Sequence, residues 1–260
     1  RNAAFTGDAL VAARADARLA TVTPEATTAK RALVATPPTV LAVARALTYP
    51  RTMIVQSSLQ ASGLPVLILL TTPDARTPYR IAAGVSMLPA AQVPGFDPLA
   101  AGSPALAAAD TAPDGRYAKL VQGYAASLAY PSSPKAVAPG ITAGDAFSTA
   151  VRANAAKQAA ALAALGSFRQ QHEARTVTGG LRTAGGQAAL VFAVIDRSDT
   201  ALVRSGTLTL TKEFTTLSGL SAVTSEVNLS TLEVVALVVP ASGPATVVGG
   251  EEHLYGAQGA

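Results

Sequence analysis

The stretch GLPVLILLTTPDARTPYRIAAGVSML, residues 63–88, decides the fold prediction because it has the pattern of one complete β-hairpin. Leu64 to Leu70 form an unbroken apolar run that is too short to span a bilayer and is typical of a buried strand. Residues 79–87 then alternate at period two, which indicates a half-buried strand. Between these segments, the prolines and the Asp of residues 72–78 mark a turn.

The sequence before this hairpin predicts one helix and two further strands. Thr6 is suited to cap a helix over about residues 7–20, and Asp8 lies in its first turn, where the helix dipole favours an acid. Two segments with β-type patterns follow, at 40–47 and 51–59. Together with the hairpin they give a four-stranded antiparallel meander after one helix, which is a complete α+β unit.

The sequence after the hairpin predicts two helices and then six strands. One amphipathic helix is expected at 115–129, and a longer one from Thr142 to about residue 165, with a capping box between Thr142 and Asp145. Gly166 predicts a kink with a second helix start after it, and residues 196–199 predict a turn between strands. The expected strands are 174–183, 187–196, 201–211, 222–227, 229–239 and 245–255.

We therefore predict an α+β protein made of two tandem units, each a helix on a curved antiparallel sheet. The units are residues 1–98 and 99–260, the second with an extra N-terminal helix, and a second hairpin with a proline-bracketed turn at 232–255 supports the duplication. The strands at 64–70, 189–195 and 232–239 are apolar on both faces, so both faces must be covered. We expect the sheets to pack on each other, or on a partner, across a large apolar interface.

Composition excludes several classes of function. The net charge is +4, but the cationic residues are scattered singly, and this argues against nucleic acid as a partner. The chain contains no cysteine, which removes disulfides, thiolate metal sites and thiol nucleophiles. Glycine pairs occur without the following Lys-Ser/Thr of a phosphate-binding loop. We predict no metal and no cofactor.

Few residues qualify as chemical groups of a site. Glu233 and Asp196 are the carboxylates flanked by apolar strand runs, and Glu233 is the one candidate for a catalytic acid or base. A Glu inside a strand lies more often on the solvent face of the sheet. His172 and His253 each follow or precede a Glu but lack the i, i+4 spacing of a helical zinc site, so we interpret both as solvated surface groups. Changing these three residues is accordingly expected to leave stability and partner binding nearly unaffected.

Three short segments carry a resemblance to a known family. Tyr49-Pro50-Arg51, Leu64-Pro65-Val66-Leu67 and Asp74 to Arg80 are similar to a domain of unknown function found in actinobacterial exported lipoproteins. The helix followed by a curved antiparallel sheet also resembles the cystatin-like and nuclear-transport-factor-like folds. This resemblance implies an extracytoplasmic, membrane-anchored lipoprotein whose anchor lies before residue 1, and it assigns no catalytic residue.

Competing functions follow from this reading. The first is a non-catalytic extracytoplasmic module that binds or scaffolds another envelope protein or a cell-wall component. The alternatives are a cone-pocket enzyme of isomerase or dehydratase type, which requires a buried acid or base, and a carrier of a small apolar ligand. An open interior with a polar residue inside it distinguishes the pocket functions from the scaffold, since a filled interior removes both.

Overall fold

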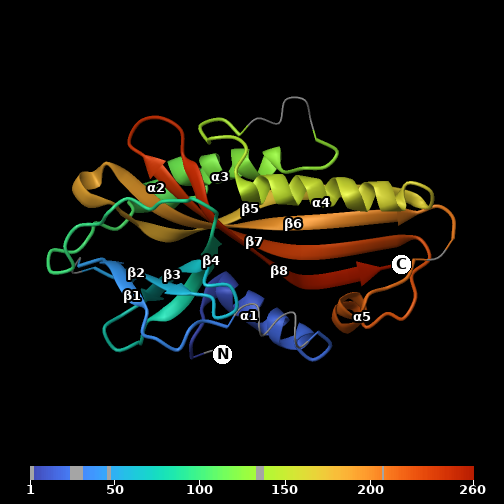
Figure 1. The fold of residues 1–260 in the computed structure, drawn as a ribbon, viewed down its shortest axis with the longest axis horizontal. Coiled ribbons are helices and arrows are strands. Elements are labelled where there is room, and N and C mark those ends of the chain that lie inside the picture. The colour runs from blue at the N-terminus through green and yellow to red at the C-terminus, as the bar shows by residue number, and fades with distance from the viewer. Residues whose placement is uncertain (1–2, 24–31, 46–47, 133–137, 207) are drawn as a thin grey trace.

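The computed structural model of the chain describes residues 3–23, 32–45, 48–132, 138–206 and 208–260. In this described part, the strands form a single eight-stranded antiparallel sheet, which confirms the predicted α+β class (Figure 1). The elements in chain order are α1 Gly7–Leu19, β1 Thr39–Val43, β2 Arg51–Ser58, β3 Pro65–Thr72, β4 Arg80–Met87, α2 Ala108–Thr111, α3 Arg116–Ser127, α4 Ala146–Leu162, β5 Gly166–Arg182, a 3₁₀ turn at Ala184–Gly186, β6 Ala188–Val203, α5 Lys212–Ser218, β7 Glu226–Pro240 and β8 Thr246–Gly259.

The sheet consists of two meanders joined by their last strands, in the order β1-β2-β3-β4-β8-β7-β6-β5. The predicted hairpin is present as β3 and β4, which pair antiparallel with Leu67 opposite Val85. At the junction, Ser86 and Met87 of β4 are the residues that pair with β8 in the described part of the chain. Beyond this short pairing the two strands diverge, and β8 continues to Gly259 alongside β7.

The two halves of the sheet pack on each other across an apolar core. One face of β6 and β7 packs on the inner face of β2 to β4. Packing of this kind was expected from the strands that are apolar on both faces. The opposite face of β5 to β8 is covered by α3 and α4, which lie on the other side of these strands in Figure 1. The first core contains Ile54, Leu67, Leu69, Ala83, Val85, Leu190, Phe192, Val194, Leu232, Val234 and Ala236.

Helix α1 lies where β4 and β8 diverge, and contacts both strands. Phe5 forms a bridge with Ile81 of β4, and the backbone N–H of Thr6 donates to the carbonyl of Ile81, so the chain enters the helix beside the N-terminal end of β4. Thr6 is the N-cap residue as predicted, but its side chain makes no capping hydrogen bond. Helix α4 contacts β5 instead, so the two helices lie differently on their meanders, which a close duplication does not predict.

Several predicted boundaries in the second half are wrong. β6 runs without interruption through residues 196–199, which are paired on both sides with β5 and β7, so the predicted turn does not exist. β5 begins at Gly166, where a second helix start was expected. Asp145, rather than Thr142, caps α4 by accepting a hydrogen bond from the Ser148 N–H. The sequence interpretation also missed α5, since residues 208–211 precede a short helix and form no strand.

No helix in the described part of the chain has both the length and the apolar character needed to cross a membrane.

Candidate functional site

A cluster of charged side chains lies at the centre of the long meander, on the face covered by α3 and α4. It is assembled by the strand register, which places His172 of β5 opposite Arg197 of β6, and Arg197 opposite Thr231 of β7. Glu233 lies two residues along the same face of β7, opposite Glu252 of β8. Because β6 is continuous, neighbouring strands bring residues distant in sequence within contact of one guanidinium group.

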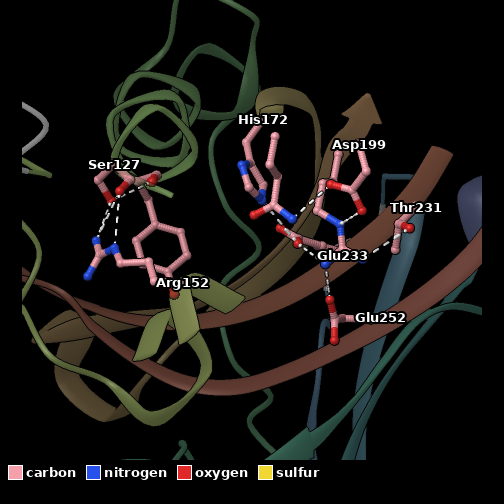
Figure 2. Close-up of polar contacts among 10 residues, drawn as sticks. Ser127, Arg152, His172, Asp199, Thr231, Glu233 and Glu252 are labelled. Atoms are coloured by element: carbon pink, nitrogen blue, oxygen red, sulfur yellow. Dashed lines mark hydrogen bonds and ion pairs between the residues drawn. The ribbon is translucent and has the colours of Figure 1, made fainter. Parts of the chain in front are cut away.

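Arg197 contacts most members of this cluster. Figure 2 shows the side chains of Asp199, Thr231, Glu233 and Glu252 converging on one point. Nη1 of Arg197 lies 3.0 Å from Oε1 of Glu233, and its Nε lies 3.2 Å from Oδ2 of Asp199. Nη1 also donates to Oε1 of Glu252, and Nη2 donates to Oγ1 of Thr231 at 3.3 Å. One cation therefore faces three carboxylates.

His172 and Gln170 add hydrogen bonds at the edge of the cluster, but some of its polar atoms remain without a partner. Nε2 of His172 lies 3.2 Å from Oε1 of Glu233, and Nε2 of Gln170 donates to Oδ1 of Asp199 at 2.8 Å. Oε2 of Glu233 and Nδ1 of His172 have no hydrogen-bond partner among the described residues. A buried polar atom without a partner carries a free-energy cost, so these two atoms reduce the stability that the cluster provides.

Burial and charge act in opposite directions on the ionisation of this cluster. Burial lowers the pKa of Arg197, but the carboxylates of Asp199, Glu252 and Glu233 outweigh it, and the net pKa of Arg197 is raised. Burial raises the pKa of Asp199, and the opposing effects of Arg197 and Gln170 do not compensate. This direction is physically reasonable, because three negative charges around one buried cation leave an excess of negative charge.

A second set of polar contacts joins α3 to α4 above the sheet. The hydroxyl of Tyr124 donates to Oδ1 of Asp145 at 3.0 Å. The Arg152 guanidinium donates to the Ser127 carbonyl at 3.0 Å (Figure 2). Burial raises the pKa of Tyr124, with a further contribution from the charge of Asp145. Glu233 also raises it, which places this pair within electrostatic reach of the cluster. These contacts fix the two helices over the charged residues.

The structure places the predicted site residues differently from the sequence interpretation. The side chains of His172 and Glu233 are both 0% exposed, so the predictions of a surface histidine and of a solvent-facing glutamate are wrong. His253 is also largely buried, with its Nδ1 3.0 Å from Oδ2 of Asp16. Asp196 lies on the opposite face of β6, where it accepts hydrogen bonds from Arg175 and Tyr255.

A histidine beside a glutamate is a recurrent acid–base pair in enzymes, but reactive groups must reach a substrate. Neither His172 nor Glu233 lines the grooves described below. Among the described residues, no group of three or more His, Asp or Glu side chains is placed to hold a metal ion. In this arrangement the cluster can hold strands and helices together. Its members Arg197, Asp199, Thr231 and Glu252 line the wider of these grooves, whereas His172 and Glu233 do not.

An apolar groove of about 230 Å³ runs along α1. One wall is formed by small residues of the helix, Ala9, Ala12 and Ala13, and the other by side chains of β3, β4 and neighbouring segments. Ala9 and Ala13 lie four residues apart, so they share one helix face. The apolar residues opposite them are Phe5, Leu33, Leu59, Val66, Ile68, Ile81, Val85, Val194 and Val234.

One end of the apolar groove is polar and opens onto a wider groove of about 570 Å³ beside β8. The grooves share four lining residues, Asp16, Leu59, Ser86 and Glu251. Hydrogen bonds order this end, because Oγ of Ser86 donates to Oε2 of Glu251 at 3.0 Å, and His253 contacts Asp16. The wider groove adds the acids Asp199, Glu213 and Glu252, and the base Arg197.

The sequence interpretation overlooked Arg197 and Asp199 because it assigned them to a turn. A pattern that could have identified them is the period-two continuation of Ile195 through Arg197 and Asp199, which keeps all three on one face of a long strand. The groove beside α1 had no comparable indication, because alanines facing a strand occur in any helix packed on a sheet. Comparison of the chain with protein-family models, curated proteins and solved structures found no match.

Proposed function

We propose that this chain is a non-catalytic binding module whose ligand site is the apolar groove beside α1. The observation that carries the proposal is a contrast in access: the acid–base pair of His172 and Glu233 is 0% exposed, whereas the groove is open and has mainly apolar walls with a polar end. Concave apolar sites with a few convergent polar groups are the usual form of small-molecule sites. This choice favours the ligand-carrier alternative over the cone-pocket enzyme.

The resemblance to exported lipoproteins supports a proposal about location. We place the module outside the cytoplasm, tethered to a membrane by a lipid anchor and acting next to other envelope proteins or cell-wall components. The scattered basic residues support a partner other than nucleic acid. A rigid sheet with cores on both faces suits a module that presents a site without changing shape.

The division into two tandem cystatin-like units, 1–98 and 99–260, is retained as a proposal about origin. It is supported by the mirrored strand order, in which two four-stranded meanders, each with a helix before it, meet through their last strands. The different positions of α1 and α4 count against a close duplication.

Titration with N-phenyl-1-naphthylamine, a neutral dye whose fluorescence rises in apolar surroundings, tests the binding proposal. We expect saturable binding that is lost in Ala13→Leu, because the larger side chain fills the groove while leucine preserves the helix. Ala156→Leu, on the exposed face of α4, is the matched control and should bind like the wild type. Equal binding by Ala13→Leu and the wild type would overturn the proposal.

A further inference from the structure

We infer that the groove beside α1 binds a short, extended apolar peptide that pairs with the edge of β4 from which β8 diverges. This inference rests on the proposed function and names the class of partner for the same site. The groove lies where the two strands separate, and the β4 residues from Ala82 to Ser86 all line it. The edge of a strand is therefore part of the site.

The backbone of Gly84 points its N–H and C=O away from β3, toward the side where β8 leaves. In an antiparallel pair, successive residues alternate between facing the partner strand and facing away from it. Leu88 directly follows β4, and its N–H donates to the carbonyl of Val248 in β8 at 2.9 Å. Counted back in steps of two, the backbones of Ser86 and Gly84 face the same side, and the register with β3 is unbroken there.

Both ends of this edge already pair with other segments of the chain. At one end, the Ile81 N–H donates to the Ala4 carbonyl, and the Ile81 carbonyl accepts from the Thr6 N–H. At the other end, β8 pairs with β4 from Ser86 onward. In the described part of the chain, Gly84 between them pairs with β3 alone. A peptide added at Gly84 would continue an interface that the fold already uses on either side.

The walls of the groove require a peptide that is apolar on both faces. Side chains of a strand alternate between the two faces of its sheet. On the face away from the central core, the groove is lined by Val66, Ile68 and Ile81. On the other face it is lined by Val194 and Val234, which belong to that core. Successive residues of an added strand would therefore meet apolar walls on either face.

Small residues leave room for a backbone beside β4. Helix α1 presents Ala9, Ala12 and Ala13 to the groove. A Cβ added at Gly84 would meet no atom within 4 Å, so the space on that face is open. Paired strands lie about 4.8 Å apart, and longer side chains at these positions would obstruct such an approach.

Backbone pairing distinguishes a peptide from an alkyl or aromatic ligand. Gly84 offers one donor and one acceptor, and a single residue of an antiparallel peptide exchanges hydrogen bonds with both. A ligand without an amide fills the apolar walls but leaves the two backbone groups without a partner. The structure therefore favours an occupant that carries backbone amides.

The test compares two peptides that differ in their backbone donors. One is acetyl-valyl-leucyl-valinamide, and the other is its analogue with an N-methyl group on each of the three residues, which removes these donors but keeps the side chains. Their affinities for the wild-type protein are measured by displacement of N-phenyl-1-naphthylamine. We expect the unmethylated peptide to bind about fivefold more tightly, which equals roughly 1 kcal/mol for one hydrogen bond.

Gly84→Pro removes the donor on the protein side. Because this N–H faces away from β3, proline leaves the β3–β4 hydrogen bonds in place, as it does on edge strands. We expect the unmethylated peptide to bind Gly84→Pro about fivefold more weakly than the wild type. Gly84→Ala is the matched control, because it keeps the N–H and its Cβ enters open space. It should bind the peptide like the wild type.

The outcomes separate this inference from the proposed function. The inference is wrong if the unmethylated peptide fails to displace the dye, if both peptides bind equally, or if Gly84→Pro and Gly84→Ala bind the peptide equally. Each of these results would leave the groove as a site for other apolar ligands. If Gly84→Pro does not fold, the comparison of the two peptides on the wild type decides alone. Equal dye binding by Ala13→Leu and the wild type would instead overturn the binding function itself.

Discussion

Two arginines illustrate how burial changes the meaning of the same contact. Arg197 and Arg175 each lie about 3 Å from carboxylates, with Arg197 3.0 Å from Glu233, and Arg175 2.9 Å from Asp8 and 3.0 Å from Asp196. Asp196 and Arg197 are consecutive on β6, so the two networks lie on opposite faces of one strand. The Arg175 side chain is 38% exposed, but that of Arg197 is only 14% exposed and Glu233 is fully buried.

Distance alone therefore does not predict the energetic role of these ion pairs. Exposed pairs contribute about 0–1 kcal/mol, because water and salt screen them. Removing one partner of a buried pair costs far more, because the other charge remains desolvated. The Arg197 cluster should therefore contribute strongly to the packing of β5 to β8 and the helices above them. The Arg175 network, which links α1 to the sheet at the surface, should contribute little.

Replacing Arg197 is expected to have the largest effect. Arg197→Met keeps an aliphatic side chain of similar length but leaves three carboxylates without their cation. We expect the free energy of unfolding in urea to fall by about 3–5 kcal/mol. Arg169→Met, at an exposed position of β5, is the control and should change little. A loss below about 1 kcal/mol for Arg197→Met would show that the cluster is effectively solvated.

Glu233→Gln should have an intermediate effect, because Arg197 keeps Asp199 and Glu252 after the change. We expect a loss of about 1–2 kcal/mol, typical of a hydrogen bond to a charged group, measured by the same urea unfolding. A loss as large as that of Arg197→Met would contradict the view that the cluster carries an excess of negative charge.

Asp199 should make the stability of the Arg197 cluster depend on pH. Because burial raises its pKa above the usual 3.8, the folded state holds this proton more tightly than the unfolded state does. The contribution of Asp199 to stability is therefore fully present below pH 3.8 and is lost as pH rises through the folded-state pKa. The free energy of unfolding is measured for the wild type and for Asp199→Asn from acidic to neutral pH. As pH rises, the value for the wild type should fall relative to that of the variant. The opposite slope would mean that Arg197 dominates over burial.

The smallest effect is expected for Arg175→Met. Arg175 is 38% exposed and its partner Asp196 is 33% exposed, so water screens this network although Asp8 is only 15% exposed. The loss should be about 1 kcal/mol and should shrink at high salt. Melting curves at low and high ionic strength check this. A large loss of stability that does not depend on salt would show that the Arg175 network behaves like the buried Arg197 cluster.

The sequence was sufficient for the local structure of the first half and insufficient for the charged cluster. Leu64 to Leu70 and the turn after them indicated β3 and β4 correctly, because a buried apolar run and a proline-rich turn are local features. Residues 196–199 look equally turn-like, but pairing with β5 and β7 holds them extended, and local propensity does not record that pairing.

The burial of Glu233 and His172 depended on the same long-range register. The local sequence around a Glu inside a strand does not indicate whether that face of the sheet is exposed to solvent. Here the partner of Glu233 is His172, sixty-one positions away in the sequence. The groove beside α1 was also beyond sequence reasoning, because it exists only where β4 and β8 diverge.

We propose that ligand binding depends on the groove beside α1 and that the charged cluster around Arg197 stabilises the fold. Glu233→Gln and Ala13→Leu, titrated side by side with N-phenyl-1-naphthylamine and unfolded side by side in urea, test it most directly. We predict that Glu233→Gln binds the dye like the wild type but unfolds at lower urea, and that Ala13→Leu fails to bind the dye. The contradicting result is loss of binding in Glu233→Gln with binding retained in Ala13→Leu, which would place the site at the buried acid.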